Sequence, residues 1–229
     1  MDQTTDLISG VPKKVSAAIR LLDVAGPLFA DRPFDVVSTR EIAQAASVNL
    51  SAISYHFKNK EGLYEAIFQK IIEDLAPIRD AMSILVASRC EVIRDCQSAQ
   101  RELVKTFIYG LIDAITHDNN PKWRMCLIMR ELHSRGPCFD LVTKGHINVM
   151  HDIVGKFVAV IIGKAEADDA VKLMSQALIG ICLHSALNEE FMCQRMGWNR
   201  YGPDEIQILK VATSQQIFAM LGIAETTKA

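Results

Sequence analysis

The stretch that decides the fold is STREIAQAASVNLSAISYHFKNKEGLYEAIF, Ser38–Phe68. Its apolar residues recur at helical spacing in two short segments, over about 39–46 and 50–57, and the three residues SVN separate them. That separation has the length of the turn in a helix-turn-helix unit. A basic, turn-prone KNK follows the second segment, and another helical pattern begins directly after it.

Polar residues mark where these helices begin. Ser38 and Glu41 fit the capping-box pattern, in which a hydroxyl and a carboxylate each satisfy a free backbone N–H. Asn49 is the expected N-cap of the second helix. A helix over about 13–30 is expected before both, and Pro33 would end it, because proline disfavours helical geometry in the residue that precedes it.

Helical periodicity continues through almost all of the remaining chain, which predicts an all-α protein of about nine helices. The fourth helix starts after Asn59 and runs to about Arg89, with a kink or break at Pro77. The later helices are expected at 100–116, 122–133, 139–162, 166–196 and 204–221, with Gly, Pro or Asn in each break. Two domains follow: an N-terminal helix-turn-helix domain, 1–60, and a larger C-terminal bundle, 61–229.

Composition limits the class of protein. The chain has 229 residues, of which 49% are hydrophobic and 23% charged, as expected of a folded soluble protein. The formal net charge is −2, so any basic surface must be local. Six cysteines without a C-x-x-C pair predict reduced, buried thiols. No signal peptide is recognisable, and the longest apolar runs fall short of the ~20 residues that span a bilayer. The expected location is the cytoplasm, with no membrane partner.

The two short helices have distinct faces. The apolar face would pack on Leu21, Ala25 and Phe34 and consists of Ile42, Ala43, Ala46, Val48, Ile53 and Phe57. The outward residues of the second helix are mostly small and end in two large polar aromatics: Leu50, Ser51, Ala52, Ser54, Tyr55 and His56. A helix of this outline can enter the major groove of B-DNA. The alternative is a generic helical bundle whose turn happens to contain lysines.

The same stretch resembles the N-terminal DNA-binding domain of TetR-type transcriptional repressors. The matching positions are Thr39, Ile42, Ala43, Ala46, Val48, Tyr55, His56, Phe57, Lys58, Lys60 and Leu63. The chain departs from the family pattern at Ser47, where glycine is usual, and at Ser54, where the family has an aromatic residue. The resemblance implies a partner, double-stranded DNA. It implies base-edge contacts from Leu50, Ser51, Ala52 and Ser54 and phosphate contacts from Thr39, Arg40, Tyr55, His56 and Lys60.

The C-terminal bundle has two strongly apolar helices. The segment DDAVKLMSQALIGICLHSALNEEF is apolar on more than one face, so both sides must be covered. Pairing of this helix and the last helix with their two-fold mates would form a four-helix homodimer interface. The residues expected in that interface are Met174, Leu178, Ile181, Cys182, Ile206, Leu209, Ile217 and Met220. The alternative is a thick core within one protomer.

A small-molecule effector site is expected within residues 107–160, where apolar residues mix with scattered polar ones. The candidate residues are Tyr109, Trp123, Met125, Met129, Arg130, His133, Phe139, His146 and Met150. Ordinary core packing would produce the same composition, and Arg130 and Glu131 would then be exterior charges. His146 and His151 are five residues apart, which splays them on an α-helix, so no metal site is expected.

Two further segments, MRELHSRGPCFD and MGWNRYGPDEIQ, resemble the C-terminal domain of the CecR-like branch of TetR regulators. That resemblance implies repressors that answer small, often drug-like or aromatic molecules. The expected function is a homodimeric repressor that binds a palindromic operator and is released by an apolar or aromatic ligand, without a cofactor. One alternative is a helix-turn-helix regulator controlled by a protein partner. An enzyme is a remote alternative, because the sequence has no Ser-His-Asp order, paired inward carboxylates or phosphate-binding glycine loop.

Overall fold

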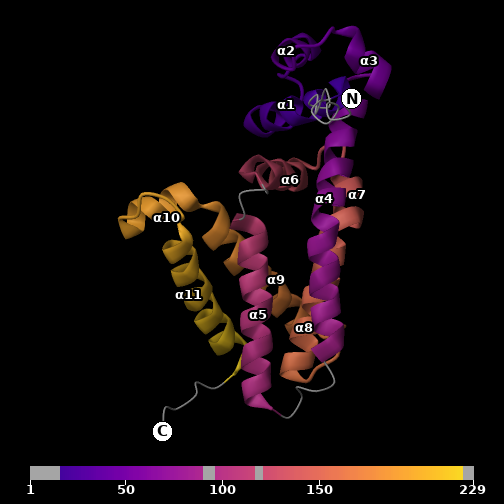
Figure 1. The fold of residues 1–229 in the computed structure, drawn as a ribbon. Helices are drawn as coiled ribbons and strands as arrows, with labels where there is room; N and C mark the ends of the chain where they lie inside the picture. The colour runs from indigo at the N-terminus through magenta and orange to yellow at the C-terminus, as the bar shows by residue number, and fades with distance from the viewer. Residues whose placement is uncertain (1–15, 90–95, 117–120, 224–229) are drawn as a thin grey trace, which may run out of the picture. The chain divides into compact units, whose positions relative to one another are not determined.

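The structure is a computed structural model that describes residues 16–89, 96–116 and 121–223 (Figure 1). Within these ranges the chain forms helices and no strands, which confirms the expected all-α fold. The chain divides into two compact units, Met1–Ile67 and Phe68–Ala229. The first unit thus extends seven residues beyond the expected boundary at residue 60, and the long helix α4, Lys60–Arg89, crosses the division.

The first unit contains α1 (Ala17–Asp31), α2 (Thr39–Ala45), α3 (Ser51–Phe57) and the first residues of α4. Helix α1 ends at Asp31 because Arg32, the residue before proline, is extended, with φ −128° and ψ 152°. The rings of Phe29, Phe34 and Tyr64 form an aromatic cluster, with centroids 4.9–5.6 Å apart. This cluster and the buried face of α2 and α3 make the core of the unit, with Leu21, Ala25, Ile42, Ala43, Ala46 and Ile53 all buried.

The predicted capping box at the start of α2 is present. The Ser38 hydroxyl accepts a hydrogen bond from the backbone N–H of Glu41 at 3.1 Å. The carboxylate of Glu41 pairs with the Arg32 guanidinium, which is the main cause of the lowered pKa of Glu41, and the backbone N–H of Ser38 lowers that pKa further. The capping box therefore forms, and its carboxylate also ties α2 to the end of α1.

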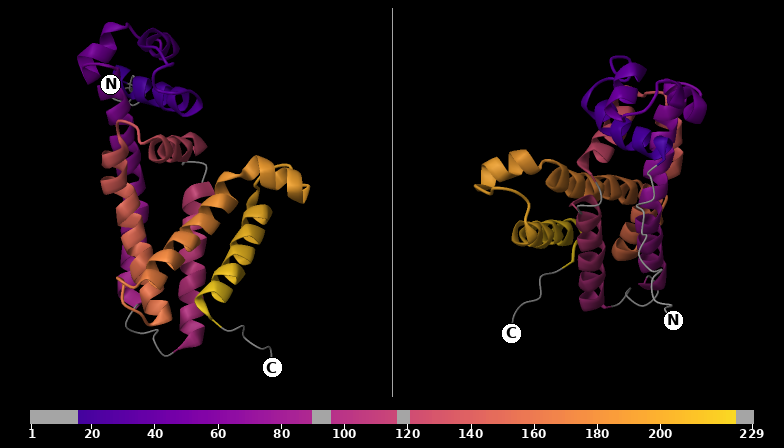
Figure 2. Two further views of the ribbon diagram at one scale, coloured as in Figure 1. Left: turned by 180° about the vertical axis from the view of Figure 1, so that it is seen from behind. Right: turned by 45° about the horizontal axis from the view of Figure 1, so that its top comes forward.

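The second unit is a helical bundle that begins with Phe68 in α4. Its other elements are α5 (Gln97–Thr116), α6 (Lys122–Ser134), α7 (Phe139–Val142), the π-helical turn η1 (Thr143–Ile147), α8 (Asn148–Ile162), α9 (Asp169–Leu187), α10 (Glu189–Met196) and α11 (Pro203–Leu221). Helix α5 packs against α9 and α11, and α8 packs against α9 (Figure 2). The rings of Phe107 in α5 and Phe157 in α8 stack in the core, with centroids 4.3 Å apart.

Three predicted helices differ from the structure. Helix α4 ends at Arg89 as expected and is continuous through Pro77, and the Arg79 guanidinium donates to the carbonyl oxygen of Ile72 at 3.1 Å in this part of the helix. The expected helix 139–162 contains the π-helical turn η1. The expected helix 166–196 breaks at Asn188, whose side-chain amide donates to the carbonyl oxygen of His184 at 3.0 Å.

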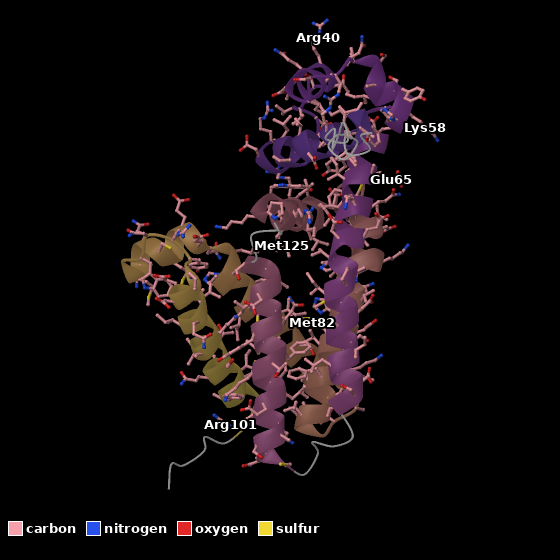
Figure 3. All side chains as sticks on the ribbon, in the orientation of Figure 1. Arg40, Lys58, Glu65, Met82, Arg101 and Met125 are labelled. Atoms are coloured by element: carbon pink, nitrogen blue, oxygen red, sulfur yellow. The ribbon has the colours of Figure 1, made fainter. Side chains whose placement is uncertain are left out.

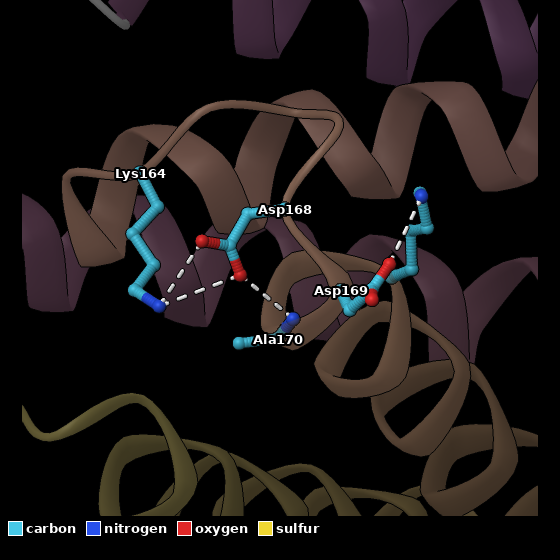
Figure 4. Close-up of polar contacts among 5 residues, drawn as sticks. Lys164, Asp168, Asp169 and Ala170 are labelled. Atoms are coloured by element: carbon cyan, nitrogen blue, oxygen red, sulfur yellow. Dashed lines mark hydrogen bonds and ion pairs between the residues drawn. The ribbon is translucent and has the colours of Figure 1, made fainter.

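Helix α9 starts at Asp169 rather than at 166 because Asp168 caps it (Figure 4). The Asp168 carboxylate accepts from the backbone N–H of Ala170 at 2.8 Å and pairs with Lys164 at 3.2 Å. The bond from Ala170 is the main cause of the lowered pKa of Asp168. An aspartate that satisfies a free N–H is a strong helix start.

One apolar stretch is longer than the sequence suggested. Among the described residues, Phe139–Ile162 is long and apolar enough to cross a bilayer by length and composition, contrary to the expectation that every run is far too short. Four of its residues, Ile153, Val154, Phe157 and Val158, are buried in the hydrophobic core of the bundle. A core helix of a helical bundle has the same length and composition, so this stretch is weak evidence for a membrane span.

The cysteines follow the expectation in part. Cys138, Cys182 and Cys193 are buried free thiols, and burial raises the pKa of Cys182 to about 12, which keeps that thiol protonated and unreactive. Cys96 and Cys126 are exposed, so the expectation that the thiols are buried is wrong for these two. Cys90 lies outside the described residues.

Candidate DNA interface and effector cavity

The turn between α2 and α3 depends on one strained residue. Ser47 has φ +52°, in the left-handed region that favours glycine. Its backbone N–H donates to Gln44 at 3.0 Å, and that of Val48 donates to Ala43 at 3.0 Å. The serine that departs from the family pattern therefore adopts the conformation that glycine would take without strain.

Asn49 caps α3 as predicted. Its side-chain oxygen accepts from both the backbone N–H and the hydroxyl of Ser51, each at 2.9 Å. The hydroxyl proton of Ser51 is thus engaged, which leaves the Ser51 oxygen available as an acceptor. Ser51 therefore offers an approaching group an acceptor rather than a donor.

The outer face of α3 is accessible. Tyr55 is 84% exposed and Leu50 is 47% exposed. Ser51, Ser54 and His56 are also exposed, Ala52 is half-buried, and Ile53 on the opposite side is buried in the core. The predicted division of α3 into an inner and an outer face is therefore present.

The predicted phosphate-contacting cations differ in their surroundings. Arg40 is exposed and points away from the first unit, as does Lys58 (Figure 3). The Lys60 nitrogen instead lies over the ring of Phe34, 4.3 Å from its centroid, and the residue is half-buried. Thr39 is also half-buried. Lys58 is thus more accessible than Lys60 at the end of α3.

Gly62 is a structural requirement that the sequence analysis missed. A Cβ atom built at Gly62 would approach the carbonyl oxygen of Phe57 to less than 3.0 Å, closer than real side chains come to backbone. Asn59 caps α4 by accepting from the backbone N–H of Gly62 at 2.8 Å. The Asn-x-x-Gly spacing was visible in the sequence, but only the sharp turn between α3 and α4 makes a side chain impossible at this glycine.

The second unit contains a cavity of about 190 Å³. Four of the nine expected ligand residues line it: Met125, Met129, His146 and Met150. Tyr109, Trp123, Arg130, His133 and Phe139 do not line this cavity. The composition of a helix does not tell which of its faces meets a cavity. The lining residues that the expectation missed include Leu75 and Ile78 of α4, Leu111 and Ile115 of α5, and Gln176 and Ile179 of α9.

A groove of about 470 Å³ adjoins the cavity. Leu75, Ile78 and Ala114 line both spaces and therefore form the wall between them. An ion pair between Arg124 and Asp74, 2.7 Å long, lies on the rim of the groove.

His146 and His151 both line this cavity. His146 lies in the π-helical turn η1. His151 lies in the following α-helix, α8, outside this turn. Among the described residues, no cluster of three metal-ligating side chains accompanies them.

The imidazole of His146 forms a buried pair with a guanidinium. The Arg79 guanidinium lies 2.9 Å from His146 Nδ1, and each residue is 9% exposed. Burial, and secondly the charge of Arg79, lower the pKa of His146 to about 4. His146 is therefore a neutral imidazole at physiological pH.

Glu131 is not an exterior charge. It is 1% exposed, and its carboxylate accepts a hydrogen bond from the backbone N–H of Cys138. The backbone N–H of Gly136 donates to the carbonyl oxygen of Glu131 at 3.2 Å. Glu131 therefore stabilises the loop between α6 and α7. The glutamate of the segment MRELHSRGPCFD thus has a structural role.

The residues expected in the dimer interface differ in their burial within the protomer. Leu178, Cys182, Leu209 and Ile217 are buried in the core of the protomer itself and leave no surface for a partner. Met174, Ile181, Ile206 and Met220 are half-buried against that core. The exposed small and apolar residues of these helices are Leu173, Ala177 and Gly180 on α9 and Ile208, Val211, Ala212 and Ala219 on α11. Helical spacing located the apolar stripes and did not distinguish the inner from the outer one.

Comparison with known proteins identifies the family. Residues 100–223, more than half of the chain, match the model of the C-terminal domain of the HTH-type transcriptional dual regulator CecR. Residues 21–67 match the model of bacterial regulatory proteins of the tetR family. The chain is a TetR-family transcriptional regulator. This TetR-family regulator is 28% identical to CecR of Shigella flexneri over 188 residues, which cover 80% of the chain and 82% of that relative.

Solved structures share the fold of this TetR-family regulator. A putative fatty acid metabolism regulator from Clostridium perfringens is 15% identical, with a TM-score of 0.58 over 91% of this chain and all of that one. AibR, solved in complex with isovaleryl coenzyme A and operator DNA, is 17% identical, with a TM-score of 0.53 over 89% of this chain and 98% of that one. The family consists of regulators of transcription that bind DNA through a helix-turn-helix, and not of enzymes.

Proposed function

We propose that this TetR-family regulator is a cytoplasmic repressor that binds a palindromic operator as a homodimer and is released by a small apolar or aromatic ligand. The observation that carries the proposal is the exposed outer face of α3, held between the Ser47 turn and Gly62. Family membership supports the DNA-binding part of the proposal.

On DNA, α3 lies in the major groove with Leu50, Ser51, Ala52 and Ser54 toward the base edges. Most of these side chains are short, so fit and DNA shape contribute more to discrimination than long hydrogen-bonding side chains do. Arg40, Tyr55, His56 and Lys58 contact phosphates, because all four are exposed. Thr39 and Lys60 contact phosphates only if their side chains leave their half-buried positions.

The homodimer forms through the exposed face of α9 and α11. Leu173 is 71% exposed and Ile208 is 50% exposed, and an apolar face of two adjacent helices is a surface that a second copy would cover. The same face carries the small residues Ala177, Gly180 and Ala212. Their size would let two-fold mates approach closely. Two-fold pairing suits an operator with two half-sites about 34 Å apart.

The ligand occupies the 190 Å³ cavity of the second unit. The AibR structure contains isovaleryl coenzyme A, which shows that a neighbour with this fold takes a small-molecule ligand together with operator DNA. A densely packed bundle without a cavity would have favoured the alternative, control by a protein partner. The ligand shifts DNA affinity only by its differential affinity for the two states of the dimer.

Selection of bound duplexes from a random pool, followed by gel shift, tests the proposal. The expected result is an enriched palindrome, bound by a particle with twice the mass of the protomer in light scattering. A monomer that enriches no sequence would contradict it. Reporter transcription from a promoter that carries the enriched site distinguishes repression from activation.

A further inference from the structure

The cavity of the second unit has a mostly apolar lining. Aliphatic and methionine side chains make most of its wall, and the polar side chains in it are His146, His151 and Gln176. His146 comes from η1, His151 from α8 and Gln176 from α9. A cavity with apolar walls and a few polar groups selects the polar group of a ligand as well as its shape.

The bond from Arg79 decides which nitrogen of His146 carries the proton. A guanidinium is always protonated and only donates, so Nδ1 of His146 accepts from Arg79 Nη1 at 2.9 Å. The neutral ring then carries its proton on Nε2. That N–H has no hydrogen-bond partner among the described residues, although the side chain is 9% exposed and lines the cavity.

Arg79 adds a positive charge behind the imidazole. It is 9% exposed, and no carboxylate of the described residues lies within the 4.0 Å of an ion pair. Its hydrogen bonds go to the neutral acceptors His146 Nδ1 and the carbonyl oxygen of Ile72. Buried charges in proteins are normally compensated, so an anion that binds His146 from the cavity is stabilised by this charge behind the ring.

The volume limits the size of the molecule. An apolar cavity of about 150 Å³ holds benzene, so about 190 Å³ suits a compact molecule of about ten non-hydrogen atoms. A nucleotide-bearing thioester is far larger than this space.

We propose that the cavity binds an apolar monocarboxylic acid of about ten non-hydrogen atoms, whose carboxylate accepts from His146 Nε2 and is balanced by the charge of Arg79. Phenylacetate and octanoate represent the aromatic and aliphatic forms of this class. The inference rests on the proposed function only in placing the effector in this cavity.

Such a ligand would act on α4. Arg79 lies in α4 and donates to the carbonyl oxygen of Ile72 in the same helix, so its contact with His146 joins η1 to α4. A carboxylate that binds His146 would change the hydrogen bonds by which His146 and Arg79 connect η1 to α4. The same helix continues into the helix-turn-helix unit at Lys60.

Isothermal titration calorimetry on the full chain without DNA tests the proposal. The probes are octanoate against octanol, and phenylacetate against phenethyl alcohol, which match in shape and differ in charge. Each acid should bind at least about tenfold more tightly than its alcohol. The variant H146L should lose about tenfold in affinity for the acids and little for the alcohols, whereas H146Q keeps an N–H donor and should recover most of the loss.

The matched control is K144A. Lys144 lies in the same π-helical turn, and its exposed side chain is absent from the cavity lining, so its removal should leave affinity for the acids within about twofold. The variant R79M should lose the acid-over-alcohol preference. Three results would overturn the inference: equal binding of acid and alcohol, no binding of either acid, or wild-type affinity for the acids in H146L. The first two are measured on the wild-type protein and therefore do not depend on whether R79M folds.

Gel shift with the selected operator separates this inference from the proposed function. Acid binding that depends on His146 and leaves the operator bound supports the inference and contradicts ligand release. An operator that is released only by uncharged molecules, without any acid preference in calorimetry, overturns the inference and supports the proposed function.

Discussion

The carbonyl oxygen of Phe57, the last residue of α3, lies so close to Gly62 in α4 that no side chain fits between them. A methyl group at Gly62 would approach that oxygen to less than 3.0 Å. The two helices can therefore follow one another within a turn of two residues, Lys58 and Asn59, of which Lys58 has φ +70°. The outward face of α3 is set by this contact.

Gly62→Ala should destabilise the protein by about 2 kcal/mol, because the new methyl group forces backbone apart. Urea unfolding measures the loss. Gly155→Ala is the matched control: a Cβ at Gly155 in α8 meets nothing within 4 Å, so alanine should stabilise that helix by up to about 1 kcal/mol. Equal effects of the two substitutions would refute the role of the Phe57 contact.

Ser47→Gly should stabilise the protein by about 1 kcal/mol, because it removes the cost of a left-handed serine. Thermal unfolding should show a rise in Tm. Gly163→Ala makes the opposite change at φ +69°, in open space, and should lower stability by about 1 kcal/mol. A fall in Tm for Ser47→Gly would show that the serine side chain contributes more than its backbone strain costs.

Lys58→Ala should weaken operator binding and reduce the salt dependence of log K by about 0.9, the value for one lost phosphate contact. Lys60→Ala should change the salt dependence less, because the Lys60 nitrogen lies over the Phe34 ring. Gel-shift titrations at several salt concentrations measure both slopes. A larger slope change for Lys60→Ala than for Lys58→Ala would mean that Lys60 leaves the ring on binding.

The folded protein should lose stability as pH falls, because of His146. Its pKa is about 4 in the folded state and 6.5 as the ordinary value, so the unfolded chain binds the proton first. The contribution is fully present above about pH 6.5 and is lost between there and about pH 4, with about 2 kcal/mol gone by about pH 5. Urea unfolding at about pH 7 and pH 5 measures this loss, and H146Q should lack it. A wild-type stability that does not change over this range would contradict a buried neutral His146.

Leu173→Glu should convert the dimer into a monomer in light scattering while leaving the helical circular dichroism unchanged, because Leu173 is 71% exposed in the protomer. A charge buried in an apolar interface without a partner costs several kcal/mol. Lys172→Ala, at the exposed neighbouring position, is the control and should remain dimeric. A dimeric Leu173→Glu would place the interface elsewhere.

Local patterns in the sequence predicted the helix-turn-helix well. Ser38, Asn49 and Pro33 act within a few residues of their own positions, and each does what its spacing indicates. The failures lie where a distant residue decides. Leu178 and Ile217 were expected in a dimer interface and are buried in the protomer core, because helices from elsewhere in the bundle cover them.

The sequence by itself determined the helical fold, the order of the helices, the outward face of α3 and the family, because periodicity, caps and the motif are local properties of the chain. Only the tertiary structure decided which apolar stripe of α9 and α11 is core and which is surface, and which residues of α4 to α9 line the cavity. It also brought Arg79 to His146, 67 residues away. Burial depends on what packs against a helix from elsewhere in the chain, and the spacing of one helix carries no information about that neighbour.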